Sequence, residues 1–198
     1  MWDQRYQNEN FVYGTAPNDF LAEQAYRIPQ GSVLCLAEGE GRNAVYLAQK
    51  GYQVHAIDLS PVGRDKAMSL ALKTGTHIRY DIGDLAHLEI APNKWNAIVS
   101  IFAHTPSALR REIHQKVVSG LQPGGVFILE AFSPQQLSCS GFGGPQNPDM
   151  LMSLQHLKQE LAELKLLVSR ECLRPINEGE LHRGECSVVQ LVGIKPLV

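Results

Sequence analysis

The sequence contains no block of basic residues and no long apolar run. Basic residues occur only in short pairs such as Arg110-Arg111, and the formal net charge is −2. Such a balance gives no positive surface for nucleic acid or for an anionic membrane. The first ten residues are polar, unlike a signal peptide, and no uncharged apolar run is long enough to cross a bilayer. We therefore expect a cytoplasmic protein that binds neither nucleic acid nor membrane.

Cysteine and histidine are not spaced as metal ligands or as a disulfide framework. The four cysteines are scattered without a C-x-x-C pair, and none of the seven histidines lies in an H-E-x-x-H motif. This pattern is typical of reduced thiols in a cytoplasmic protein and predicts no bound metal. A chain of 198 residues is large enough to bury a core without such cross-links. We expect one domain over 1–198, with a cap segment at 1–30 and a core at 31–198.

A glycine-rich stretch follows the first apolar run of the predicted core. Residues 33–36 have the composition of a buried strand, and a helical pattern of apolar residues begins at Ala44. The glycines between them, Gly39 and Gly41, allow a ligand to approach the backbone at the start of the helix, where amide N–H groups are unpaired. Asp58 closes a second apolar run, 19 positions after Gly39, where a carboxylate accepts hydrogen bonds from ribose hydroxyls. This arrangement predicts a cofactor that contains a nucleoside.

The glycine spacing alone also fits the dinucleotide pattern G-x-G-x-x-G/A. The residues around it are more specific, because VLCLAEGEGRNAVYLA and the later GYQVHAIDLSP resemble the first motif and acidic strand end of class I S-adenosylmethionine-dependent methyltransferases. The chain is most similar to the small bacterial group related to tellurite-resistance and thiopurine methyltransferases. The resemblance extends over nearly the whole chain and includes the aromatic segment from Trp2 to Gly14, Asp84-Leu85, the turn at 121–125 and Leu181-His182-Arg183-Gly184.

The resemblance implies S-adenosyl-L-methionine as cofactor, with Asp84 accepting a hydrogen bond from the adenine amino group. Many family members have D-x-G-x-G-x-G where this chain has Cys35 and Ala37 in place of the acid and the first glycine. Our hypothesis is that Glu38 supplies the missing negative charge. The candidate cofactor site consists of the loop, the two acidic strand ends and the end of the fourth strand: Glu38, Gly39, Glu40, Gly41, Arg42, Asn43, Asp58, Leu59, Ser60, Asp84, Leu85, Ile101, Phe102 and Ala103.

From Ser32 onward strands alternate with helices, which predicts a parallel sheet covered on both faces. We expect strands at 33–36, 52–57, 77–80, 95–102, 126–132, 165–173 and about 186–194. The last run is nearly continuously apolar, so it should lie inside the sheet with the preceding strand at the edge. The predicted fold is α/β: a three-layer, Rossmann-like, seven-stranded, mostly parallel sheet whose antiparallel C-terminal strand lies beside the fifth, as in class I methyltransferases.

Several residues are predicted to reach the acceptor side of the site. His104 follows the fourth strand and is our candidate catalytic residue, as a general base or as a group that binds the substrate. It fits equally well as an ordinary histidine at the entry of the next helix, for which Thr105 is the predicted cap. In the resembled family the N-terminal segment covers the site, which makes Tyr6 and Tyr13 candidate substrate contacts on a lid. His114 and His156 are expected to be solvated.

Two later segments should also lie on the ligand side. Residues 133–148 are rich in glycine, proline and serine, and we predict a loop that covers the substrate with Phe142 as its anchor. The antiparallel last strand begins near His182 and Arg183, so both should reach the substrate, Arg183 through its fork of donors.

The predicted reaction is in-line attack of a nucleophile on an activated methyl group. The Asn/Asp-Pro-Pro-Tyr motif of many methyltransferases acting on nucleic acid or protein is replaced by His104-Thr105-Pro106. We therefore expect a small-molecule acceptor, by resemblance a thiol or a chalcogen oxyanion. Two alternatives remain at this stage. One is an NAD(P)-dependent oxidoreductase, for which we see no substrate-binding half, and the other is a protein that binds S-adenosylmethionine without transferring methyl.

Overall fold

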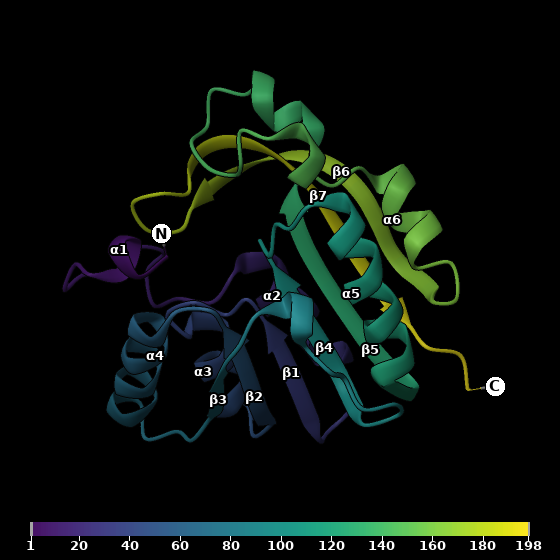
Figure 1. Ribbon diagram of the computed structural model, residues 1–198, viewed down its shortest axis with the longest axis horizontal. Coiled ribbons are helices and arrows are strands. Elements are labelled where there is room, and N and C mark those ends of the chain that lie inside the picture. The colour runs from purple at the N-terminus through teal and green to yellow at the C-terminus, as the bar shows by residue number, and fades with distance from the viewer. Residues whose placement is uncertain (1, 198) are drawn as a thin grey trace.

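The computed structural model describes residues 2–197 as a seven-stranded sheet between two layers of helices (Figure 1). The strand order is β3-β2-β1-β4-β5-β7-β6, and β7 runs antiparallel to both of its neighbours. The predicted fold, including the last strand inside the sheet and its predecessor at the edge, is confirmed. The strands are β1 (Ser32–Leu36), β2 (Gln53–Asp58), β3 (Arg79–Ile82), β4 (Trp95–Ile101), β5 (Leu121–Phe132), β6 (Lys165–Asn177) and β7 (Arg183–Ile194).

Alternating residues of the central strands divide the core into two layers. Val33 and Cys35 of β1 pack with α2 (Asp19–Gln24), α3 (Arg42–Gln49) and α4 (Pro61–Lys73) on one face. Leu34 and Leu36 pack with α5 (Ser107–Gly120) and α6 (Leu154–Glu160) on the other. This alternation is the period of two that a strand imposes. The remaining helix, α1 (Trp2–Tyr6), lies outside both layers against α4.

Local capping explains where two helices begin. Asn18 accepts a hydrogen bond from Leu21 N at the start of α2, and Ser60 accepts one from Gly63 N at the start of α4, which has proline at its first position. Both starts carry residue types that favour a helix N-terminus, namely a capping asparagine or serine and, in α4, a proline at the first position. The start of α5 differs, because Ser107 N donates to Asp149 Oδ2, 2.9 Å away in the loop after β5. The predicted cap by Thr105 is therefore wrong.

The prediction for His114 is also wrong. Its ring is buried between α5 and α6, with Nδ1 2.6 Å from Glu160 Oε2, and Arg110 binds the same carboxylate at 2.9 Å. Burial opposes ionisation of Glu160, but the hydrogen bonds from His114 and Arg110 outweigh it and lower the pKa of Glu160 to about 2. The ion pair thus fixes α6 against α5. His156 is exposed, as expected.

Several strand boundaries differ from the prediction, and β6 ends at Asn177 rather than at 173. The third strand begins at Arg79 rather than at 77, and the predicted turn at 121–125 is part of β5. No helix within residues 2–197 is both long enough and apolar enough to span a membrane.

Candidate functional site

The carboxyl ends of β1 and β4 carry backbone conformations that L-amino acids rarely adopt. After β1, the left-handed residues are Ala37 (φ 49°), Gly39 (φ 62°) and Gly41 (φ 87°); directly after β4 comes Phe102 (φ 54°). A left-handed conformation costs a non-glycine residue about 1–2 kcal/mol. Because β1 and β4 are parallel neighbours in the sheet, the strained residues Ala37 and Phe102 lie together at the carboxyl ends of these two strands. Strain of this kind clusters at functional sites.

Asp58, at the end of β2, holds the glycine-rich loop in place. Its two carboxylate oxygens accept hydrogen bonds from Gly39 N (3.0 Å) and Ser60 N (2.9 Å). Burial raises the pKa of Asp58, whereas these hydrogen bonds oppose the rise. Each carboxylate oxygen has a further lone pair, so Asp58 can also accept hydrogen bonds from ligand hydroxyls.

The other polar side chains of the loop bind protein groups. Glu40 Oε2 accepts from Val12 N at 2.8 Å, Arg42 Nη2 lies 2.6 Å from Glu178 Oε2, and Asn43 Oδ1 accepts from Asn18 N at 2.9 Å. These three predicted cofactor residues thus fasten the loop to the N-terminal segment and to the β6–β7 hairpin. The backbone of the loop and Asp58 are what this arrangement offers to a ligand.

The two glycines of the loop serve different contacts. A Cβ atom added to Gly41 would lie 2.4 Å from the Cβ of Ala67, so Gly41 permits close packing on α4. A Cβ atom added to Gly39 would lie 2.7 Å from the hydroxyl of Tyr6. Tyr6 thus covers the glycine loop, and burial followed by the nearby Asp58 carboxylate raises the pKa of its hydroxyl.

Glu38 lies three positions after Cys35, the residue at the place of the resembled family's first acid. Its Oε1 accepts from Asn43 N (2.9 Å) and Ala44 N (2.8 Å), which satisfies the start of α3. The carboxyl group also neighbours Cys35, since burial and then Glu38 raise the pKa of that thiol. Burial raises the pKa of Glu38 itself to about 7. The carboxyl group of Glu38 therefore lies beside the side chain of Cys35.

Apolar side chains and one acid surround the ends of β2 and β3. Leu59 and Ile82 are 51% and 45% exposed, although each directly ends or follows a strand. Leu85 is buried, and Asp84 is exposed with Oδ1 accepting from Ala86 N at 2.9 Å. Two exposed apolar side chains next to a carboxylate fit a flat base with an amino group.

At the end of β4, Ile101 and Ala103 are buried, and His104 uses both ring nitrogens to bind the backbone. Nδ1 lies 2.8 Å from the carbonyl oxygen of Met150, and Nε2 accepts from Phe132 N at 3.2 Å. A carbonyl only accepts and an amide N–H only donates, so Nδ1 carries the proton and the ring is neutral. Burial lowers the pKa of His104 to about 4. This bonding favours the structural interpretation of His104 over the general base.

The neutral His104 predicts a pH dependence of stability. Because its folded pKa is about 4 and the ordinary value is 6.5, the unfolded chain takes up a proton first as pH falls below 6.5, and the folded state loses stability. In urea unfolding, His104→Asn should remove up to about 3 kcal/mol of the stability change between pH 6.5 and pH 4. An unchanged slope in the variant would contradict this assignment.

Aromatic rings line the space between β4, β5 and the hairpin. The ring of His182 lies 4.5 Å from Tyr13, 4.6 Å from Phe102 and 5.2 Å from Phe132, between centroids. His182 is buried, and its Nδ1 has no hydrogen-bond partner within the described residues. Burial, and then the charge of Arg42, lower the pKa of His182 to about 3, so the ring is neutral. An unpaired buried nitrogen between flat rings is suited to a ligand with one polar group.

Phe142 and Arg183 lie beside this cluster in a way the sequence did not predict. Their backbones pair as an isolated bridge, with Phe142 N donating to Arg183 O at 2.6 Å. The Phe142 side chain is 63% exposed, so the backbone rather than the ring anchors the covering loop. Arg183 is exposed, and its Nε donates to Gly179 O at 2.7 Å.

A buried charge network behind the site was not predicted. Glu130 on β5 is fully buried; Arg174 Nη2 lies 2.5 Å from its Oε1 and 2.8 Å from Glu178 Oε1, and Glu178 continues to Arg42. Asn18 Nδ2 donates to both carboxylates, at 2.8 and 2.9 Å. The sequence did contain one sign of this network, because Glu130 is a single acid within the apolar run VFILEAF. A buried charge of this kind requires a partner. Its partners come from other elements and lie far away in the sequence.

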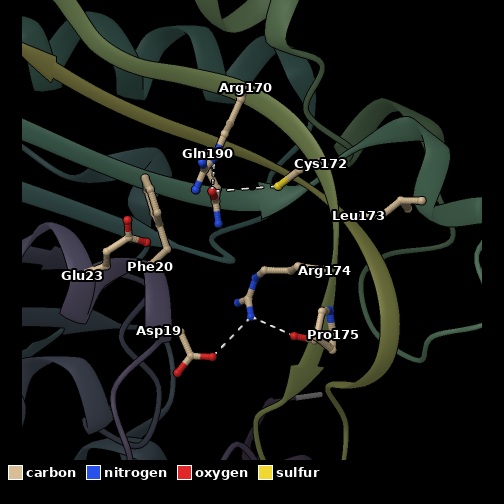
Figure 2. Close-up of a pocket in the computed structure, with 9 residues that line it drawn as sticks. All are labelled: Asp19, Phe20, Glu23, Arg170, Cys172, Leu173, Arg174, Pro175 and Gln190. Carbon is tan, nitrogen blue, oxygen red and sulfur yellow. Dashed lines mark hydrogen bonds and ion pairs between the residues drawn. The ribbon is translucent and has the colours of Figure 1, made fainter.

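Figure 2 shows a cavity on the outer side of this network, between α2 and the β6–β7 hairpin. The cavity has a volume of about 400 Å³ and contains Arg174, which also lies 3.5 Å from Asp19 across the opening. A second concavity, of about 440 Å³, lies beside α5. Both are away from the glycine loop, so we place the functional site by its chemistry and not by these cavities.

Comparison with known proteins finds similarity to methyltransferases. Residues 33–125 match the family model described as a methyltransferase domain. The 2-heptyl-1-hydroxyquinolin-4(1H)-one methyltransferase of Mycobacteroides abscessus is 26% identical over 142 residues, and the alignment spans 63% of each protein. Less than two thirds of that relative is therefore covered.

Two solved structures share the fold. TehB from Haemophilus influenzae has a TM-score of 0.74 at 18% identity, covering 98% of this chain and 65% of TehB. An S-adenosylmethionine-dependent methyltransferase from Methanosarcina mazei has a TM-score of 0.70 at 17% identity, covering 88% of this chain and 97% of that one. The domain match over residues 33–125, the sheet topology and the glycine loop with Asp58 together make this chain similar to the class I S-adenosylmethionine-dependent methyltransferases.

Proposed function

We propose that the protein transfers a methyl group from S-adenosylmethionine to a small-molecule acceptor. The observation that carries this proposal is the carboxylate of Asp58 bonded to Gly39 N, beside the strained end of β4. Asp58 would accept hydrogen bonds from the ribose hydroxyls, Asp84 would accept one from the adenine amino group, and the loop backbone would contact the amino-acid part. When bound, the cofactor supplies a methyl group on a positively charged sulfur.

The residues of this chain then need to orient the acceptor and exclude water. Alignment of bound reactants lowers a barrier by about 7–11 kcal/mol, so the site needs no nucleophilic side chain. Tyr6 and Tyr13 would cover the site from the N-terminal segment, and His182 would bind the polar group of the acceptor through Nδ1. A neutral imidazole nitrogen either donates to an oxyanion or accepts from a hydroxyl or a thiol.

Two classes of acceptor fit the site. A thiol or a chalcogen oxyanion corresponds to the resemblance with tellurite-resistance and thiopurine methyltransferases. A flat hydroxylated heteroaromatic compound fits the rings of Tyr13, Phe102 and Phe132, and the Mycobacteroides abscessus relative is named for a hydroxyquinolinone. The aromatic walls favour the second class, whereas the partnerless nitrogen of His182 suits both.

A methyl-transfer assay tests the proposal. Purified protein with S-adenosylmethionine and a panel of thiols, tellurite, selenite and hydroxylated quinolines should form S-adenosylhomocysteine with at least one acceptor, and Asp58→Ala should abolish it. Cofactor binding without turnover on the whole panel would instead indicate a binding protein. Binding of NAD(H) with no binding of S-adenosylhomocysteine would indicate the oxidoreductase alternative.

Glu38→Gln tests whether the displaced acid contributes to cofactor binding. At pH 8, above the pKa of about 7, Glu38 is ionised and should stabilise the positively charged cofactor. We expect isothermal titration calorimetry to show a loss of affinity for S-adenosylmethionine of about tenfold at pH 8, and a smaller loss at pH 6. Exposed Glu163→Gln is the matched control. Equal affinity of Glu38→Gln and the wild type at pH 8 would refute the hypothesis.

A further inference from the structure

The turn between β6 and β7 packs closely on the N-terminal segment (Figure 1). Glu180 N donates to Val12 O at 2.8 Å, and the ring of Tyr13 lies 4.5 Å from that of His182. Gly179 has a φ of 71° and no room for a side chain, because an added Cβ atom would lie 2.1 Å from Val12 O and 2.5 Å from Tyr13 Cα. The obstructing atoms are backbone, so they cannot rotate away.

The same N-terminal segment covers the glycine loop. Val12 N donates to Glu40 at 2.8 Å, and the Tyr6 hydroxyl lies over Gly39. Lys66 of α4 binds both the loop and the N-terminal segment. Its Nζ lies 2.5 Å from Glu40 Oε1. The same atom donates hydrogen bonds to the carbonyl oxygens of Tyr6, Asn8 and Asn10 at 3.3, 2.8 and 2.7 Å. A cofactor on the loop backbone would thus lie beneath residues 2–14.

The hairpin turn is also tied to the loop itself. Arg42, the first residue of α3, bonds to Glu178 through Nη2 at 2.6 Å and to Tyr13 O through Nη1 at 3.4 Å. On its other side the hairpin pairs with the covering loop through Arg183 and Phe142. The turn at residues 178–182 therefore contacts both the N-terminal segment and the glycine loop, and Arg183, directly after it, pairs with the covering loop.

We propose that residues 178–182 form a latch that holds the N-terminal segment, residues 2–14, closed over the glycine loop. Release of the latch would govern entry and departure of the nucleoside cofactor. The part that concerns cofactor exchange rests on the proposed function, whereas the closure of residues 2–14 by the turn does not. Local opening of such a segment requires few contacts to break compared with the core of the sheet.

Gly179→Ala tests the latch, with Gly75→Ala as its matched control. Both glycines have a positive φ, 71° and 66°, so both variants acquire the same kind of backbone strain. An added Cβ atom at Gly75 would meet no described atom within 4 Å apart from its chain neighbours, whereas at Gly179 it meets the N-terminal segment. The difference between the two variants therefore isolates the contact.

The first readout is hydrogen exchange of the protein without ligand. Gly179→Ala should speed exchange of backbone amides in residues 6–14 by about tenfold or more, as expected when a local closing contact is lost, and leave β1 and β4 unchanged. Gly75→Ala should leave residues 6–14 as in the wild type. Equal exchange of residues 6–14 in the two variants would overturn the latch.

The second readout is the dissociation rate of S-adenosylhomocysteine, measured by stopped-flow displacement. Gly179→Ala should raise this rate roughly tenfold over Gly75→Ala, since contact losses act mainly on dissociation. If hydrogen exchange of residues 6–14 became faster but the dissociation rate of S-adenosylhomocysteine stayed the same, the role of the latch in cofactor release would be overturned. If the wild type binds no S-adenosylhomocysteine, the proposed function fails. The hydrogen-exchange experiment on the ligand-free protein still tests whether residues 178–182 hold residues 2–14 closed.

Discussion

Asp58→Ala is expected to weaken binding of S-adenosylhomocysteine by on the order of 10²–10⁴-fold, because hydrogen bonds to a charged group contribute about 1.5–3 kcal/mol each and two ribose hydroxyls would lose theirs. The substitution also removes the acceptor for Gly39 N and Ser60 N, which loosens the loop from β2. Isothermal titration calorimetry measures the loss directly.

The matched control for this result is Asp65→Asn, which changes an exposed acid on α4 whose ion-pair partner among residues 2–197 is its neighbour Arg64. It should bind S-adenosylhomocysteine as tightly as the wild type. Circular dichroism should show that Asp58→Ala keeps its secondary structure, because the sheet does not depend on this carboxylate. An Asp58→Ala protein that is folded and binds within threefold of the wild type would contradict the assigned role.

The second large effect concerns stability. Glu130→Ala is expected to lower the free energy of unfolding by about 3–5 kcal/mol, the typical result of removing one partner from a buried ion pair. Glu130 is fully buried and binds Arg174 through two nitrogens, at 2.5 and 3.2 Å, and Gln190 at 2.5 Å. Without it, the guanidinium of Arg174 loses one of its two buried carboxylates. Urea unfolding followed by circular dichroism gives the change.

A charge-balanced double substitution separates lost charge pairing from lost packing. In Glu130→Leu/Arg174→Met one negative and one positive charge leave together, and Glu178 keeps its ion pair with Arg42. Replacing a buried pair by apolar residues of similar size is often neutral or stabilising. The double variant should therefore be more stable than Glu130→Ala. Equal or lower stability of the double variant would show that the network does not act through its charge balance.

Much of the sheet could be predicted because its determinants are local. The run at 33–36 is apolar throughout, which is the pattern of a strand buried on both faces. Ser60 and Pro61 mark the start of α4 within two residues, and the nearly continuous apolar character of the last run predicted that β7 lies inside the sheet. Thr105 and His114 were misjudged because Asp149 and Glu160, the partners that decided their roles, come from later parts of the chain.

The functional site was predictable only where its chemistry follows from backbone geometry. The glycine loop and Asp58 lie close in sequence and on neighbouring strands, so their contact could be anticipated. The use of Arg42 could not, because Glu178 lies 136 positions away and the sequence contains no sign that the two meet. In the same way the two backbone bonds of His104 depend on Met150 and Phe132, which the chain brings together only in the folded protein.

A crystal structure of the protein with S-adenosylhomocysteine is the most direct measurement of the central assignment. The prediction is that both ribose hydroxyls lie within hydrogen-bond distance of the Asp58 carboxylate, with the amino-acid part of the ligand against the backbone of the glycine loop and beside Tyr6. A ligand found in the cavity between α2 and β6, or anywhere else away from the glycine loop, would contradict it.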